Sequence, residues 1–374
     1  MAFGQSSAQH MEGSANQTIN NTILFLFKGM TFDVNPVTLP LALFVMVQNL
    51  FIVRHFLADH QKLTSWLYIG IALMDILKAQ GQLILSIMGI NVFRNYKLED
   101  INDVSERFEL LIYSLYYYMA TAVPGMNCSK ILNLTLALSL TINIVDPFRT
   151  LNKRIIKTVA VIICIITVLL HMFDIIATCL YVRKWGYLMH GDKRFYLYLS
   201  LIFEDPGLSG IIASSCFSRS CLWGHKLKYH LLILISAVLY FTLPPTIMLI
   251  LMVVQVIFLR RNLCEFSSQE RSRSTYQHVS LTIRLISLLF FMCNTTYCLA
   301  FLLYSRFDKM KEFNVNTFNE SYYEKQGISL GIAEFTLPLI YAGVYPVILV
   351  CRKEDLRHRY FGYWKKLLEV IYPK

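Results

Sequence analysis

Residues 37–57 read VTLPLALFVMVQNLFIVRHFL, and residues 66–90 read WLYIGIALMDILKAQGQLILSIMGI. The first run has one charged side chain, Arg54 near its end, and the second has two, Asp75 and Lys78. An apolar run of about 20 residues is long enough to cross the hydrocarbon core of a bilayer as a helix. The two runs therefore predict a pair of membrane-spanning helices joined by a short polar connection.

Five further apolar runs follow along the chain. They lie at residues 110–144, 155–181, 230–259, 280–304 and 328–350. Only 16% of the residues are charged and 55% are hydrophobic, whereas soluble proteins have about 25% charged residues. A disordered chain is excluded by the same numbers. The sequence predicts an all-α membrane protein, a seven-transmembrane helix bundle over residues 37–351. Residues 1–36 would form an outer tail, and residues 352–374 a short amphipathic helix and tail.

Charge indicates the orientation of the bundle. With the N-terminus outside, the inner segments carry 18 Lys and Arg against 7 acidic residues, and the outer segments carry 15 against 14. Basic loops favour the inner side of a membrane, where anionic lipids would meet them. Because these basic residues are divided among four short segments, nucleic-acid binding is not expected. We expect a multi-pass plasma-membrane protein with its N-terminus outside.

Sequons for N-linked glycosylation agree with this orientation. Those at Asn16, Asn20 and Asn319 fall in segments predicted to lie outside, so they are candidate glycosylation sites. Three others fall within predicted spans and are interpreted as coincidental, namely Asn127, Asn133 and Asn294.

Four short motifs stand in order along the spans. Residues 47–53 read VQNLFIV, 71–77 read IALMDIL, 241–244 read FTLP and 290–297 read FFMCNTTY. They resemble, in turn, the motifs Gly-Asn-x-Leu-Val, Leu-Ala-x-x-Asp-Leu-Leu, Phe-x-x-Pro and Phe-x-x-Cys-Trp-x-Pro-Tyr of rhodopsin-like (class A) G-protein-coupled receptors. The chain is similar to that family over almost its whole length.

Two other motifs depart from the family pattern. Residues 139–149 read SLTINIVDPFR, and Ser139, Leu140 and Thr141 stand where the family has Asp-Arg-Tyr. The arginine of the family's charged switch is therefore missing. Residues 345–349 read YPVIL and keep only the proline of Asn-Pro-x-x-Tyr.

The resemblance implies a receptor that binds an extracellular ligand, a peptide or a chemosensory small molecule, and activates a heterotrimeric G protein. The candidate conformational-switch residues are Asn49, Asp75, Lys78, Ser129, Lys130, Pro244, Phe290, Cys293, Asn294 and Pro346. The implied ligand-binding residues are Tyr117, Tyr118, Ala122, Tyr297 and Glu334. The residues implied to face the G protein are Pro147, Arg149, Lys153, Arg154, Arg260 and Arg261.

One group of switch residues combines opposite charges within a span. Asp75 with Ser129 resembles the family's internal sodium site. Lys78 lies three residues from Asp75 on the same helical face, and Lys130 is adjacent to Ser129. We expect an ion-pair network of Asp75 with Lys78 and Lys130 in place of sodium. The alternative is that Lys78 extends along its own helix towards the membrane surface.

The ligand class is only partly restricted by the sequence. Ala122 occupies the position where the resemblance would put the aspartate of amine receptors, so a biogenic amine is disfavoured. Tyr117 and Tyr118 could line a ligand pocket or belong to an interfacial aromatic belt. Glu334 could face a ligand or form a buried pair.

The remaining residue patterns give few alternatives. Cys216 and Cys221, in a loop predicted to lie outside, are candidates for a local disulfide. Cys351 is either palmitoylated or a buried thiol. No His, Cys or carboxylate spacing predicts a metal site, and no catalytic motif, cofactor or enzyme activity is expected.

Two other functions stay open: a receptor-like protein that does not couple to G proteins, and a small-solute transporter or channel.

Overall fold

Every regular element in the described part of the chain is a helix, so the predicted all-α class is confirmed for those residues. The computed structural model describes residues 28, 32–57, 62–94, 101–145, 152, 154–169, 172, 243–265, 281–282, 284–293, 325, 328–329, 332–352 and 354–371.

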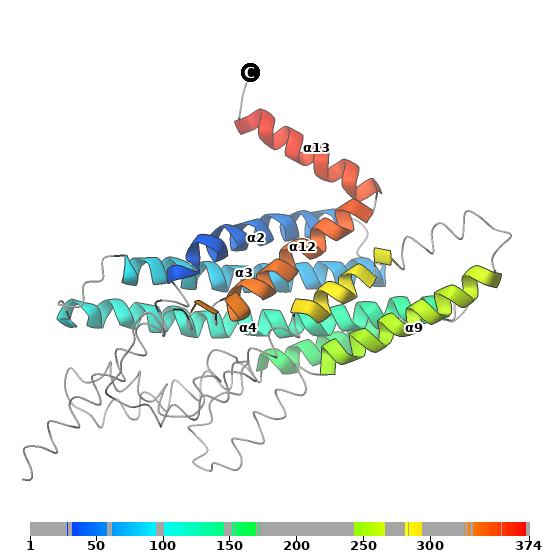
Figure 1. The fold of residues 1–374 in the computed structure, drawn as a ribbon, viewed down its shortest axis with the longest axis horizontal. Coiled ribbons are helices and arrows are strands. Elements are labelled where there is room, and N and C mark those ends of the chain that lie inside the picture. Colours follow the sequence, from blue (N-terminus) through cyan, green and yellow to red (C-terminus); the bar gives the residue numbers. More distant parts are fainter. Residues whose placement is uncertain are drawn as a thin grey trace, which may run out of the picture.

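The long helices pack as neighbours. Helices α2 (Asn35–Leu57), α3 (Leu63–Phe93) and α4 (Ile101–Val145) lie side by side, and α9 (Leu243–Glu265) packs on α4 (Figure 1). The π-helical turn η5 (Ile332–Thr336) leads into α12 (Leu337–Arg352), which packs on α2 and α3. Helix α13 (Glu354–Ile371) leaves the end of α12 at an angle (Figure 1). Two more helical segments cover residues 154–169 and 284–293.

Two described helices are long and apolar enough to cross a membrane by length and composition. They are Asn35–Leu57 and Leu63–Asn91, and they match the first two predicted spans. Three shorter apolar helices are Leu243–Phe258, Arg284–Cys293 and Leu337–Arg352. Helix α4 contains the whole of the third predicted span, and several polar residues are buried in its middle, among them Asn127, Ser129, Lys130 and Asn133. Each predicted span overlaps a described helix, while the count of seven membrane crossings stays a prediction.

Small residues bring α3 and α4 close together. A Cβ atom placed on Gly125 of α4 would lie 2.7 Å from the carbonyl oxygen of Met74 and 3.2 Å from the amide nitrogen of Lys78, both in α3. A Cβ atom on Gly81 would lie 3.0 Å from the Cβ of Ala122. Small residues at such contacts let helix backbones approach, and membrane helices use them widely.

Helix α2 buries polar side chains and exposes apolar ones, which is the reverse of the pattern in a soluble protein. Its polar residues Thr38, Gln48 and Asn49 are buried, whereas Val47 and Leu50 are exposed by 49% and 55%. In a water-soluble helix the polar side chains occupy the exposed face. The same outward apolar character recurs elsewhere, at Ile155, Val159, Ile162, Ile166, Ile250, Val253 and Ile257.

The predicted amphipathic C-terminal helix is present as α13. Its residue Leu356 is fully buried in a core cluster that includes Ile52, Leu67 and Leu349. Tyr360 accepts a hydrogen bond of 2.7 Å from Gln48 Nε2 and packs edge-on against an α2 phenylalanine. Its exposed basic residues are Arg357, Arg359 and Lys365, beside the exposed Phe361. Helix α13 is thereby attached to α2 as well as to α12.

Candidate functional site

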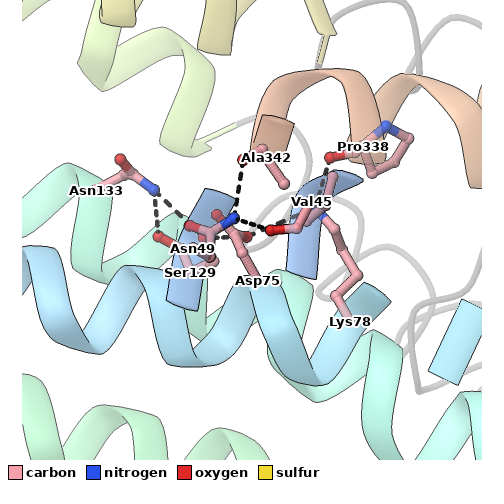
Figure 2. Close-up of polar contacts among 8 residues, drawn as sticks. All are labelled: Val45, Asn49, Asp75, Lys78, Ser129, Asn133, Pro338 and Ala342. Atoms are coloured by element: carbon pink, nitrogen blue, oxygen red, sulfur yellow. Dashed lines mark hydrogen bonds and ion pairs between the residues drawn. The ribbon is translucent and has the colours of Figure 1, made fainter. Parts of the chain in front are cut away.

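A buried carboxylate forms the centre of the candidate site. Asp75 of α3 is fully buried, and its Oδ1 accepts a 3.0 Å hydrogen bond from Ser129 Oγ of α4 (Figure 2). Lys78 Nζ lies 3.6 Å from the same oxygen. A buried carboxylate is stable only with such partners, because removing a charge from water is costly. The expected contact between Asp75 and Lys78 is present in the structure.

Lys78 also connects α3 to the start of α12. Its Nζ donates a 2.5 Å hydrogen bond to the carbonyl oxygen of Pro338 (Figure 2). The side chain is therefore directed into the helix bundle, and only 5% of the residue is exposed. In the described structure it does not extend outward along its own helix, which was the alternative interpretation.

Asn49 connects α2 to α12 at a proline. Its Nδ2 donates to the carbonyl oxygens of Val45 at 2.9 Å and Ala342 at 3.1 Å (Figure 2). Ala342 lies four residues before Pro346, which has no N–H group to satisfy that carbonyl within the helix. The asparagine thus supplies the hydrogen bond that Pro346 removes, and two motif residues from distant segments meet.

Asn133 belongs to the same cluster, although the sequence indicated only a coincidental sequon there. Its Nδ2 donates to Ser129 O at 2.8 Å and to Ser129 Oγ at 3.4 Å (Figure 2). The spacing of four residues puts both side chains on one face of α4, and this was the signal available in the sequence. Asn133 is 1% exposed, so its side chain is inaccessible in the folded bundle.

A small cavity adjoins the cluster. Its volume is about 20 Å³, enough for one water-sized particle. The residues lining it are Lys78, Met126, Ser129, Lys130, Phe290, Cys293, Pro338 and Tyr341. The structure thus places Lys130 on the cavity wall beside Ser129, while the described partners of Asp75 are Ser129 and Lys78. The cavity is far too small for an organic ligand, which needs about 300–1,000 Å³.

The other switch residues pack around this cavity or near it. Phe290 and Cys293 are buried with Met248 of α9, and the Phe290 ring meets Tyr341 edge-on at 5.4 Å between centroids. Pro346 is buried in α12. Pro244 is also buried, in α9. Asn294 lies outside the described residues.

The residues implied in ligand binding are only partly described. Tyr117 accepts a 3.1 Å hydrogen bond from Gln80 Nε2, and Tyr118 packs edge-on against Phe335 of η5. Ala122 is fully buried at the close contact of α3 with α4. Glu334 belongs to η5, but its side chain lies outside the described residues, as does all of Tyr297.

A polar contact that the sequence did not indicate joins α4 to α9. Gln255 Nε2 of α9 donates a 2.6 Å hydrogen bond to Thr141 Oγ1 of α4, and Thr141 donates in turn to the carbonyl oxygen of Ala137 at 2.7 Å. Both Thr141 and Gln255 are buried. At the end of α12, Arg352 Nε donates to Thr282 Oγ1 at 3.4 Å. The bond between Gln255 and Thr141 therefore joins two neutral side chains, whereas the bond to Thr282 has a charged donor.

Most residues implied in surface functions lie outside the described part of the chain. Arg154 is exposed at the start of the 154–169 helix, and Cys351 is an exposed free thiol. Outside the description lie Pro147, Arg149, Lys153, the side chains of Arg260 and Arg261, the sequons Asn16, Asn20 and Asn319, and Cys216 with Cys221.

No protein-family model matches the chain, and no curated protein matches it either. Within the described residues, no group of three or more His, Cys, Asp or Glu side chains is arranged to hold a metal ion.

Proposed function

We propose that the chain is a rhodopsin-like seven-transmembrane receptor of the plasma membrane, with its N-terminus outside. It binds an extracellular peptide or chemosensory small molecule and activates a heterotrimeric G protein. The observation that carries this proposal is the meeting of separate motif residues in one buried network. Asn49 reaches the α12 carbonyl left open by Pro346, and Asp75 binds Ser129.

The outward apolar faces support the membrane part of the proposal. Helix α2 buries Gln48 and Asn49 and exposes Phe44, Val47 and Leu50. In water, this distribution would leave large apolar side chains solvated and desolvate amides. In a bilayer, the same distribution is the favourable one, because polar groups are satisfied inside the bundle.

The network offers a mechanism for signal transmission. Helix α12 is held to α3 through Lys78 and to α2 through Asn49. A ligand that binds better to one arrangement of these helices shifts the population towards it. The proposed change is an outward movement of the inner end of the sixth span, which opens a cleft for the G protein. The outer side would sense the ligand, and the polar network would couple the two ends.

The test is ligand-free G-protein activation in cells that overexpress the protein. We expect a basal signal that Asp75→Ala changes severalfold at equal surface expression. Leu73→Ala is the matched control, since Leu73 lies on the same helix but is 46% exposed. Failure to activate any G protein would count against the proposal and favour a receptor-like protein without coupling.

That second candidate has one specific observation in its favour. Leu140 occupies the position of the family's arginine, and the adjacent Thr141 is bound to Gln255 rather than left available. A transporter or channel is the remaining candidate, since Asp75, Lys78 and Lys130 are all buried charged residues. Solute flux into proteoliposomes would identify that function.

A further inference from the structure

The cavity between α3, α4, α12 and residues 284–293 admits only a very small occupant. Its volume of about 20 Å³ exceeds the minimum of about 10–15 Å³ for one water. A monatomic ion or a single water fits.

The wall of the cavity is rich in hydrogen-bond donors. Lys78 and Lys130 both line it and are each 5% exposed, and an ammonium group has three donors and no acceptor. Lys78 Nζ donates one hydrogen bond, to Pro338 O, and lies 3.6 Å from Asp75 Oδ1, so its donors are not all used by Pro338. The Cys293 thiol adds a weak donor.

A tyrosine hydroxyl on the same wall is an independent sign of an occupant. Tyr341 lines the cavity and is 5% exposed, and its Oη has no hydrogen-bond partner among the described residues. A buried hydroxyl without a partner is unfavourable, and such groups usually bind an ion or water that completes them.

From these observations we propose that the cavity binds one chloride ion, held by Lys78, Lys130 and the Tyr341 hydroxyl. A cation is disfavoured because two ammonium groups line the wall, whereas Asp75, whose Oδ2 has no hydrogen-bond partner among the described residues, is not among the residues that line it. The inference depends on the packing of the described helices and not on ligand binding or G-protein coupling. Chloride would screen the two lysines from each other and fix α12 against α4.

The test uses the purified full-length chain in lipid nanodiscs. Its thermal unfolding midpoint is measured in sodium chloride, choline chloride and sodium gluconate at equal ionic strength. We expect a saturable rise of a few degrees with either chloride salt and none with gluconate. Equal midpoints in chloride and gluconate would indicate a water-filled cavity and overturn the proposal. A midpoint that follows sodium instead of chloride would indicate a cation site and overturn it as well.

Two tyrosine variants localise the effect. Tyr341→Phe keeps the ring that packs on Phe290 and removes only the hydroxyl, so we expect at least a fivefold increase in the chloride concentration for half-maximal stabilisation. Tyr345→Phe is the matched control. Its hydroxyl is also buried without a described partner, but Tyr345 does not line the cavity, so its chloride response should equal the wild type. Identical chloride responses in the two variants would place the ion elsewhere and refute the assignment.

Discussion

At the scale of single residues, two contacts hold the buried cluster together: Asp75 with Lys78, and Asn49 with the carbonyl oxygen of Ala342. Asp75 and Lys78 are three residues apart, and a helix places such residues together, so their contact could be predicted. Asn49 and Ala342 are separated by 293 positions in the sequence. Their hydrogen bond forms only because α2 packs beside α12. The sequence could indicate that Asn49 matters, but not which carbonyl it satisfies.

Asn49→Ala should destabilise the protein. The change removes the donor to Ala342 O, and Pro346 ensures that no backbone N–H replaces it. A buried carbonyl without a partner costs about 1–3 kcal/mol, which thermal unfolding in nanodiscs would detect as a lower midpoint. Leu50→Ala is the control, because the neighbouring Leu50 is 55% exposed. Equal midpoints for the two variants would contradict the role assigned to Asn49.

The pair of Asp75 and Lys78 should show strong coupling in a double-mutant cycle. Either Asp75→Asn or Lys78→Met leaves one charge buried without its counterpart, at a cost of about 3–5 kcal/mol. The double variant removes both charges and should recover much of that loss. Free energies of unfolding of the four proteins give the coupling, and additive effects would show that the two groups do not interact.

At the scale of elements, hydropathy located helices better than it located their ends. The run at 66–90 corresponds to α3 at Leu63–Phe93, a difference of three residues at each end. The run at 110–144 underestimates α4, which begins at Ile101, because residues 101–109 are helical but polar. An apolar run indicates which part of a helix would contact lipid. The helix itself extends for as long as its backbone hydrogen bonds continue, whether or not its side chains are apolar. Helix packing through Gly81 and Gly125 was not predictable, because a glycine in a sequence does not identify its neighbour.

Gly125→Ala should separate α3 from α4. The new methyl group would lie 2.7 Å from a carbonyl oxygen and 3.2 Å from an amide nitrogen, and neither backbone atom can move without its helix. We expect a loss of about 1–3 kcal/mol of stability. Gly362→Ala in α13 is the control: a Cβ there meets nothing within 4 Å, so the substitution should be neutral or stabilise by up to about 1 kcal/mol. The thermal unfolding midpoints of both variants test this prediction. An unchanged midpoint for Gly125→Ala would contradict the close contact.

At the scale of the whole molecule, a buried bond between two neutral side chains, Thr141 and Gln255, joins α4 to α9. If this bond holds the bundle closed, Thr141→Val should raise ligand-free G-protein signalling severalfold, since valine keeps the shape and loses the hydroxyl. Thr135→Val is the control, because Thr135 bonds only to Ile131 O within its own helix in the described structure. A signal that rises equally in both variants would exclude a specific role for Thr141.

Glycosylation tests the predicted orientation of the molecule. Enzymatic removal of N-glycans from protein made in eukaryotic cells should lower its apparent mass, and Asn16→Gln, Asn20→Gln and Asn319→Gln should each remove one glycan. Asn127 and Asn133 should carry none, because both are buried within α4. An unmodified Asn319 alongside a glycosylated Asn16 would contradict the number of crossings between them.

The attachment of α13 to α2 also has a consequence for biosynthesis. Gln48 is synthesised before its hydrogen-bond partner Tyr360, which lies 312 residues further along the chain. At a translation rate of about 5–20 residues per second, α2 is complete roughly 15–60 s before the tyrosine exists. During this interval the amide of Gln48 has to be satisfied by water or by a chaperone of the insertion machinery. Helix α13 is therefore made long after α2 and completes its packing.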